Sequence, residues 1–499
     1  MTLTKSAREG RRTAMDTQST DPRHDRLIMA LACLGSFVVV LDATIVSVVL
    51  PRIRSELGFG TSTLPWTVNA YTLAFAGALL LGGRCADVFG LRRILLAGMG
   101  LFTAASLAAG LAPAAPVLLA ARAVQGFGGA LLMPTILSLL TSTFTEGARR
   151  ARALSTWSAV GAVGAASGPI AGGVLTQLGS WRWVFFVNVL LGLIAMVGTV
   201  RLLPRATRSG AGPRLDIVGA LLATAGLTGI VYAVMESQSA SWTAPLVAGP
   251  LLAGVALGAA FLAHQARWAA DPLVPLQLFK ARAVGSANVV MFLLGLGFFG
   301  APVFISFALQ YVHGFGPLAA GAGFLPAGLA MFAAAKAAGP LTVRLGPRRA
   351  AVLGCVIGAL GFLALAVLLD TDGSYIWTVA VPSVVFGFGT ASAFTPLTVV
   401  ATSGVAATHS GVAAAVLNTV RQNSGAVGLA VMSAVAAAVT AGRAAGAEAL
   451  VTGYDAAFLV SGGCVAAAAA VGAIALPRSG RTPVVVQVRE PAAEAGGSR

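Results

Sequence analysis

About fourteen apolar segments of close to 20 residues each constrain the fold of this chain more than any other feature of its sequence. A helix of about 20 residues crosses the roughly 30 Å of hydrocarbon in a bilayer. Strand-like alternation of apolar and polar residues is absent, which disfavours a β-barrel. We therefore predict an all-α integral membrane protein with spans at roughly 27–50, 64–82, 94–112, 115–140, 153–178, 183–203, 215–235, 245–266, 284–311, 317–338, 350–369, 375–400, 412–440 and 456–476.

The placement of the charged residues supports this interpretation. A net charge of +16 could suggest a nucleic-acid partner. However, 26 of the 33 Lys and Arg residues fall in the tails or in loops on one side of the predicted membrane, with four on the other side and three within spans. This asymmetry follows the positive-inside rule and predicts that both termini are cytoplasmic. The predicted partner is the lipid bilayer and not nucleic acid.

The sequence gives no sign of a metal site, a cofactor or a nucleotide-driven pump. Four cysteines lie in or beside the predicted spans with no paired spacing, so neither a disulfide framework nor a zinc site is indicated. The phosphate-binding pattern GxxxxGK[ST] is absent, which argues against transport driven by hydrolysis. We expect no cofactor and no enzymatic activity.

A short polar segment between two apolar runs, Gly83–Arg93, occurs a second time as Gly339–Arg349. Four of its residues recur 256 positions later, namely Gly83, Gly90, Arg92 and Arg93 at Gly339, Gly346, Arg348 and Arg349. A fixed offset indicates a duplicated unit. Glycine permits a tight turn between two helices, and arginine holds such a turn on the cytoplasmic side.

The length of the repeat predicts the domain organisation. Six spans with their turns need roughly 190 residues, so the surplus of about 60 indicates two extra spans between two six-helix halves. The predicted parts are a cytoplasmic polar tail (1–26), an N-terminal six-helix bundle (27–203), a basic linker with two extra helices (204–283), a C-terminal six-helix bundle (284–476) and a second cytoplasmic tail (477–499).

Charged residues inside the spans are candidate functional residues, because charge in lipid is costly. Asp42 lies about 12 Å inside the first span and Arg122 about 10 Å inside the fourth, so the two are candidates for a buried ion pair. Gln125 shares the face of Arg122, and Arg421 lies about 13 Å from the inner end of its helix, so both are possible cavity residues. The alternatives are an Asp42 that reaches the interface and an Arg122 that extends outward.

The fifth span carries a stripe of glycines at three- and four-residue spacing, Gly161, Gly164, Gly168 and Gly172, with Pro169 among them. Such a stripe lets another helix approach closely, and proline bends the span. Close packing without a functional role is the alternative interpretation.

At these residues the chain resembles the major facilitator superfamily, and specifically its fourteen-span drug:proton antiporter branch, over nearly the whole length. The signature loop matches at Gly83, Ala86, Asp87, Gly90 and Arg92, and the first-span motif at Leu41, Asp42, Thr44, Val46, Leu50 and Pro51. The fourth-span motif matches at Arg122, Gln125 and Gly126, and the exporter motif of the fifth span at Gly161, Gly168, Pro169, Gly172 and Gly173. The chain departs from the patterns at Cys85, Val88, Leu91 and Ser47.

The resemblance implies that two halves rock around a central cavity and exchange protons for a small amphipathic drug or antibiotic across the bacterial plasma membrane. Asp42 and Arg122 would couple the proton, and the bend at Gly168–Pro169 would resist leak. A cytoplasmic latch would consist of Gly83, Asp87, Gly90, Arg92 and Arg93. The second copy of the loop has Val343 in place of the acid. We expect a monomer.

Two other functions are compatible with this scaffold. One is a facilitator or importer of a small nutrient, against which the exporter motif of the fifth span argues. The other is a non-transporting membrane sensor, for which we expect an added soluble domain larger than either tail. The sequence does not identify the substrate.

Overall fold

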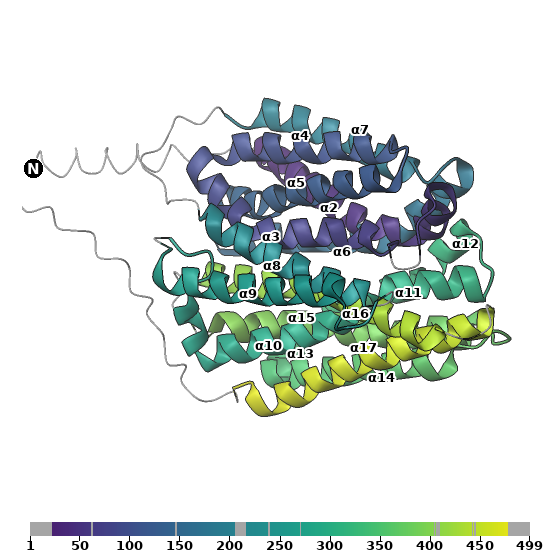
Figure 1. Cartoon of the computed structure of the whole chain (residues 1–499). Coiled ribbons are helices and arrows are strands. Elements are labelled where there is room, and N and C mark those ends of the chain that lie inside the picture. Colours follow the sequence, from purple (N-terminus) through teal and green to yellow (C-terminus); the bar gives the residue numbers. More distant parts are fainter. Residues whose placement is uncertain are drawn as a thin grey trace, which may run out of the picture.

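The computed structural model describes residues 22–60, 63–144, 147–204, 216–237, 240–269, 271–403, 405, 410–441, 443 and 446–477. Most of both predicted tails and the basic centre of the linker, 205–215, lie outside the described residues. Long helices, roughly parallel to one another, form two bundles that lie side by side (Figure 1). The prediction of an all-α protein is confirmed for the described residues.

The first bundle contains the six helices α2 (Pro22–Leu57), α3 (Trp66–Phe89), α4 (Leu91–Gly110), α5 (Ala115–Thr143), α6 (Gly147–Leu178) and α7 (Trp183–Leu202). Its first helix begins before the predicted boundary at 27 and continues through Pro51 to Leu57. A proline within a helix removes one hydrogen bond and bends the axis, but it need not end the helix. Burial of Ile53 beyond this proline favours the continuation.

The second bundle begins after the short helix η2 (Leu276–Lys280). It contains α10 (Arg282–Phe298), α11 (Ala301–Phe307), η3 (Ala308–Val312), α12 (Pro317–Ala322), α13 (Leu325–Leu345), α14 (Pro347–Leu368), η4 (Ile376–Ala380), α15 (Val381–Ser403), α16 (Ser410–Thr440) and α17 (Ala447–Ala475). Three predicted spans are interrupted near Gly300, Gly323 and Val381, where one helical segment gives way to the next. The last helix begins nine residues before its predicted start at 456.

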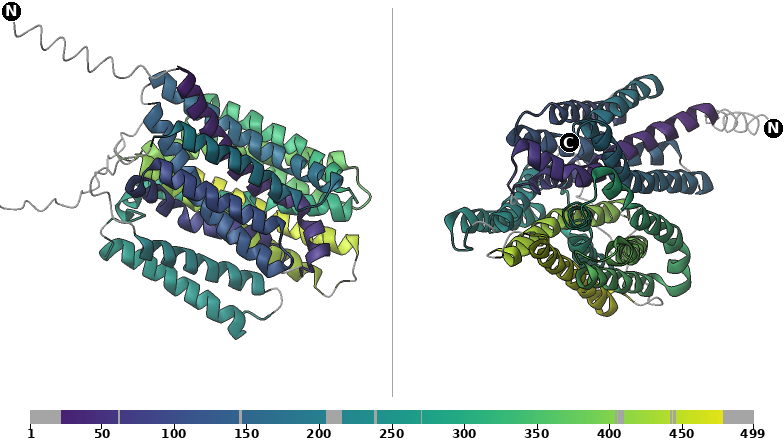
Figure 2. Two further views of the ribbon diagram at one scale, coloured as in Figure 1. Left: turned by 90° about the horizontal axis from the view of Figure 1, so that it is seen from above. Right: turned by 90° about the vertical axis from the view of Figure 1, so that its right-hand side faces the viewer.

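Two further helices, α8 (Ile217–Glu236) and α9 (Pro245–Arg267), lie between the bundles in sequence and at their margin in space (Figure 2). They pack mainly on each other, and α8 also contacts α3 and α16. Asp216 joins their ends, because its carboxylate lies 2.8 Å from His264 Nε2 and accepts a hydrogen bond from Gln265 Nε2 at 2.5 Å. Gln265 in turn accepts from the Val274 amide at 3.0 Å, which ties the pair to the segment that precedes η2.

Thirteen of the described helical segments are long and apolar enough to cross a membrane. Helix α3, which overlaps the predicted span 64–82 but continues to Phe89, is not among them, although it packs along α5 inside the first bundle. The structure therefore supports a membrane protein with many spans.

The two copies of the polar loop have the same backbone geometry. Gly90 ends α3 and begins α4 with φ 86°, and Gly346 ends α13 and begins α14 with φ 78°. These positive φ values favour glycine, since a side chain would strain the backbone. The duplication read from the sequence is therefore also present in the conformation of the turns.

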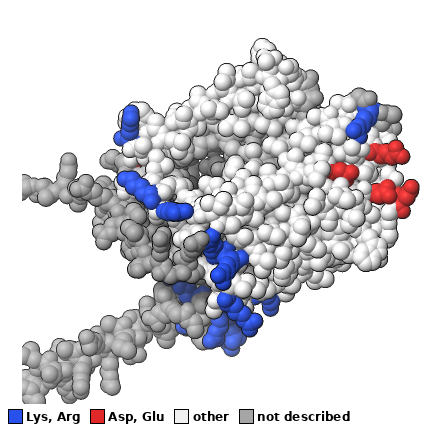
Figure 3. Space-filling view, turned by 90° about the horizontal axis from the view of Figure 1, so that it is seen from below, with Lys and Arg blue, Asp and Glu red and all other residues white. Residues whose placement is uncertain are grey.

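The molecule has one strongly basic end and one acidic end (Figure 3). The basic end, as we call it, holds arginines in the first turns of α4, α6, α10 and α14, namely Arg92, Arg149, Arg282 and Arg348. There Arg149 pairs with Asp25 at 2.7 Å, and Arg282 and Arg348 donate to carbonyls at the end of α17. At the other end, which we call the Glu56 end, Glu56 pairs with Arg182 at 2.7 Å and accepts from Trp181 Nε1 at 2.8 Å.

Contacts between the two bundles occur near the Glu56 end. Gln310 donates to the Val48 carbonyl at 2.9 Å. Gly173 of α6 lies against the backbone of Pro317, and Gly321 of α12 lies against the backbone of Pro169. With no side chain on either glycine, the two bundles meet backbone to backbone.

Candidate functional site

The candidate site is an ion pair buried inside the first bundle. Asp42 of α2 and Arg122 of α5 are both 0% exposed, and Asp42 Oδ2 lies 2.6 Å from Arg122 Nη1. The sequence placed these two residues at similar depth, and the structure brings them into direct contact. Neither is oriented toward the interface, so the two alternatives left open by the sequence do not apply.

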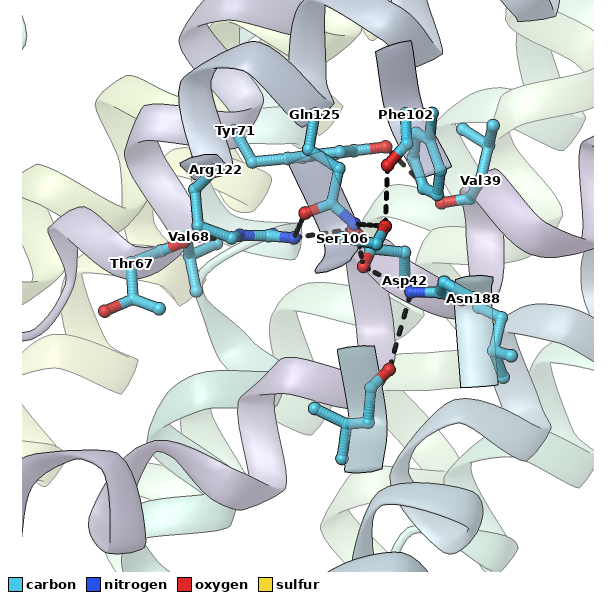
Figure 4. A network of polar contacts seen from close by, with 12 residues as sticks. Val39, Asp42, Thr67, Val68, Tyr71, Phe102, Ser106, Arg122, Gln125 and Asn188 are labelled. Atoms are coloured by element: carbon cyan, nitrogen blue, oxygen red, sulfur yellow. Dashed lines mark hydrogen bonds and ion pairs between the residues drawn. The ribbon is translucent and has the colours of Figure 1, made fainter. Parts of the chain in front are cut away.

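Polar groups from several helices satisfy the carboxylate of Asp42 (Figure 4). Its Oδ1 atom accepts hydrogen bonds from Gln125 Nε2 and from Asn188 Nδ2, each at 2.7 Å. Gln125 Nε2 also donates to Ser106 Oγ at 2.8 Å, and Ser106 donates to the carbonyl of Phe102. The two amide donors and the guanidinium together stabilise an ionised Asp42, which would otherwise be costly in this apolar interior.

Arg122 is held from the other side. Its Nε donates to the carbonyl of Thr67 at 2.9 Å and its Nη1 donates to Gln125 Oε1 at 2.7 Å. The ring of Tyr71 lies under the guanidinium, with Cζ 4.4 Å from the ring centroid, so a cation–π contact adds to the attraction. Arg122 Nη2 is buried without a hydrogen-bond partner among the described residues.

All members of this network belong to the first bundle: Asp42 on α2, Thr67 and Tyr71 on α3, Ser106 on α4, Arg122 and Gln125 on α5, and Asn188 on α7. Gln125, predicted as a possible cavity residue, is fully buried within the network. The sequence did not single out the other members, Thr67, Tyr71, Ser106 and Asn188. The available signal was weak, because neutral polar residues are common in membrane helices.

The glycine stripe of α6 packs against α2 next to this network. A Cβ atom on Gly168 would collide with Thr44, and one on Gly172 would lie 2.7 Å from the carbonyl oxygen of Ile45. Gly173 faces the second bundle. A Cβ atom on Gly161, by contrast, would meet no other described atom within 4 Å, so Gly161 is not part of the close contact.

The predicted latch lies at the basic end. Arg92 Nη2 donates to the carbonyl of Val200 at the end of α7, 3.2 Å away, and Arg93 is exposed. Gly83 approaches Pro134 of α5, and Gly90 forms the turn. The side chain of Asp87 lies outside the described part of the structure.

Arg421 lies apart from the Asp42 network, on α16 in the second bundle, where its Nη2 donates to Asn418 Oδ1 at 2.6 Å. No three His, Cys, Asp or Glu side chains gather around a common point anywhere in the described ranges, as a metal ion would require.

Comparison with known proteins agrees with this architecture. Residues 32–429 match the family model of the Major Facilitator Superfamily. A cephamycin export protein from Amycolatopsis lactamdurans is 41% identical over 89% of this chain and 90% of its own length. A puromycin resistance protein from Streptomyces alboniger is 39% identical over 85% of this chain and 84% of its own.

Two solved structures share the fold. One is a bacterial homologue of the human lysosomal transporter Spinster in an inward-facing conformation, with TM-score 0.66 and 16% identity, covering 92% of this chain and 98% of the other. The other is the xylose transporter of E. coli in an inward open conformation, with TM-score 0.61 and 14% identity, covering 91% and 97%.

Proposed function

This chain belongs to the major facilitator superfamily, and on that premise we propose that it exports a small amphipathic molecule, such as a drug or antibiotic, across the bacterial plasma membrane in exchange for protons. It is a multi-pass membrane protein whose relatives include antibiotic export and resistance proteins. The observation that carries the proposal is the fully buried pair of Asp42 and Arg122. An ionisable pair inside a membrane protein is costly and points to a role in moving ions or substrate.

In the proposed mechanism, Asp42 takes up and releases the transported proton. When Asp42 takes up a proton, Arg122 loses its counter-charge, and an unpaired buried charge costs about 3–5 kcal/mol. The helices α2, α5 and α7 then favour an arrangement in which water or another group reaches the guanidinium. Proton entry supplies roughly 2.3 kcal/mol per charge per 100 mV for this change.

Alternating access completes the mechanism. The bundles touch near the Glu56 end through Gln310, Gly173 and Gly321, which supports a state that is closed there. In our proposal this state opens toward the basic end. We place the basic end, and with it both termini, in the cytoplasm because basic loops stay on that side. In this proposal α3 also crosses the membrane, which together with the thirteen segments above gives fourteen spans. The protein acts as a monomer. The proposed parts of the chain are a cytoplasmic tail (1–26), the first six-helix bundle (27–203), the linker with two extra helices (204–283), the second six-helix bundle (284–476) and a second cytoplasmic tail (477–499).

Two further elements assist the motion in this proposal. The loop from Gly83 to Arg93 latches the cytoplasmic face, supported by the hydrogen bond of Arg92 to the end of α7. The Gly168–Pro169 bend keeps α6 tightly against α2, supported by the contact of Gly168 with Thr44, and so prevents proton leak.

Everted membrane vesicles test the exchange. Vesicles containing the chain are acidified inside, and puromycin or a cephamycin is added outside as the first probe. Drug uptake accompanied by proton release supports antiport, and Asp42→Asn should abolish both. Drug movement without proton release would identify a facilitator, and the absence of both would favour a sensor.

A further inference from the structure

A second arginine lies inside the molecule, in the bundle that does not contain the Asp42 network. Arg421 follows the start of α16 at Ser410 by 11 residues, which places it about 16 Å along the helix from the basic end. Among the described residues, no carboxylate lies within ion-pair distance of it. Its Nη2 donates to Asn418 Oδ1, and its Nε is buried with no hydrogen-bond partner in that same part of the chain.

Arg421 thus differs from the other arginine of the interior. Arg122 has a carboxylate, an amide oxygen and a backbone carbonyl around its guanidinium, whereas Arg421 has a single amide oxygen among the described residues. A cation inside a membrane protein is costly unless a counter-charge or water reaches it. The protein itself supplies no such counter-charge in the described residues, so a bound ligand is the natural source of one.

The surroundings of Arg421 provide a position for such a ligand. Its Cζ lies 5.4 Å from the ring centroid of Phe394 on α15. The Phe394 ring is 5.2 Å from that of Phe298, which is 5.0 Å from that of Phe299. Arg421 and these three phenylalanines are all partly exposed although α16 packs among α3, α8, α10, α15 and α17. Partial exposure at this depth means that the neighbouring side chains do not cover these four completely.

We propose that Arg421 binds a carboxylate of the exported molecule while Phe394, Phe298 and Phe299 contact its apolar part. This inference rests on the proposed export function and narrows the substrate class to amphipathic carboxylic acids. The planar guanidinium is suited to a carboxylate, and Asn418 holds one of its nitrogens in place. The aromatic rings beside it suit an apolar or aromatic body.

A matched pair of probes isolates the carboxylate. 1-Naphthaleneacetate and 1-naphthaleneacetamide differ only in the charged group, and their equilibrium binding is measured on the purified full chain in lipid nanodiscs without any proton gradient. We expect the acid to bind at least about tenfold more tightly than the amide, because hydrogen bonds to charged groups are the stronger ones. Equal binding of the two probes would overturn the proposal.

Variants assign that preference to Arg421. Arg421→Gln should remove the preference for the acid while amide binding stays within about twofold of the original, which also shows that the variant is folded. Lys336→Gln is the control, because it removes the same charge from an exposed position on α13 and should leave the preference intact. A preference that survives in Arg421→Gln would refute the assignment.

A second pair of variants keeps the test decisive if Arg421→Gln does not fold. Asn418→Ala removes the group that orients the guanidinium and should weaken acid binding severalfold without affecting the amide. Phe394→Leu should weaken both probes equally. An unchanged acid preference in Asn418→Ala, together with unequal losses in Phe394→Leu, contradicts the proposed site.

Failure of this inference is distinguishable from failure of the export proposal. Proton-driven export of puromycin with no preference for the carboxylate probe would support antiport and refute the Arg421 site. A carboxylate preference that depends on Arg421, with no proton release from vesicles, would support the Arg421 site and refute antiport.

Discussion

Asp42 Oδ2 and Arg122 Nη1 lie 2.6 Å apart with neither side chain reaching solvent. Each is the only formal charge that balances the other within the network, although Gln125 and Asn188 also donate to the carboxylate. Any event that changes the charge of Asp42 therefore changes the free energy of Arg122.

Replacement of Asp42 by Asn should abolish export driven by a pH gradient while substrate binding persists. Asparagine keeps the shape of the side chain and can still accept a hydrogen bond, but it cannot take up a proton. Loss of the counter-charge to Arg122 should also destabilise the fold, by up to about 3–5 kcal/mol. Drug accumulation in proteoliposomes with an imposed pH gradient measures the first effect, and thermal unfolding measures the second.

Glu56→Gln is a suitable control, since this acid lies at the end of the molecule outside the network. Continued accumulation by Asp42→Asn would show that another group carries the proton. Asp455 would then be the next candidate, because the structure places it inside α17 with Oδ1 buried and unpartnered among the described residues.

Gly168→Ala should impair both folding and export, whereas Gly161→Ala should be tolerated. A Cβ atom at Gly168 would collide with Thr44, close to Asp42, but one at Gly161 meets nothing within 4 Å among the described atoms. Overpacking of this kind costs about 1–3 kcal/mol. Thermal stability of the two purified variants, which differ only in position on the same helix, checks the prediction. Equal stability of both would mean that α6 and α2 do not pack as closely as described.

Acidification should loosen the junction of α8 and α9. Asp216 lies just before α8, and although burial alone raises its pKa, hydrogen bonds from the Gly219 amide, Gln265 and His264 hold the pKa below its ordinary value of 3.8. A carboxyl group with a lowered pKa stabilises the folded chain above the pKa of the unfolded chain, and this contribution is lost as pH falls through the folded value. The unfolding temperature should therefore drop as pH falls below about 4.

Asp216→Asn should show a smaller drop over the same range, because asparagine has no proton to gain. Asp372→Asn, at an exposed position, serves as the control and should behave like the unmodified chain. Identical pH profiles for Asp216→Asn and the unmodified chain would show that this carboxylate does not contribute.

A cysteine at Ser374 should react with an impermeant maleimide added outside intact cells, and a cysteine at Lys280 should not. Both positions are exposed, with Ser374 before η4 at the Glu56 end and Lys280 at the end of η2 near the basic end. The variants are made in a chain lacking its four native cysteines. Labelling of Lys280→Cys from outside would invert the proposed orientation.

Most of the fold could be predicted from the apolar runs, but the helix ends could not. The predicted span 94–112 corresponds to α4 at Leu91–Gly110, since hydropathy registers the buried part of a helix well. The start of α17 was predicted at 456 and observed at Ala447, because a carboxylate at 455 lowers hydropathy without ending the helix. Hydropathy measures transfer to lipid and carries no information on backbone hydrogen bonding.

The candidate site could be predicted only in its charged part. Asp42 and Arg122 stand out because charge is rare in apolar spans. The Thr67 group that binds Arg122 is a backbone carbonyl, which every residue has, so the sequence cannot indicate it. Asn188 resembles any polar residue of a membrane helix. Which neutral groups complete a network depends on helix rotation and on contacts between helices that a single sequence does not specify.

The confinement of the Asp42 network to the first bundle has a consequence for binding. Arg421 and its phenylalanines lie in the second bundle, so a proton on Asp42 and a carboxylate on Arg421 occupy different places and do not displace one another. Under the two proposals, a lower pH on the loading side should weaken cargo binding although the two ligands do not share a place, because protonation lowers the fraction of chains in the conformation that loads cargo. Proton and cargo would then influence each other only through the relative position of the two halves.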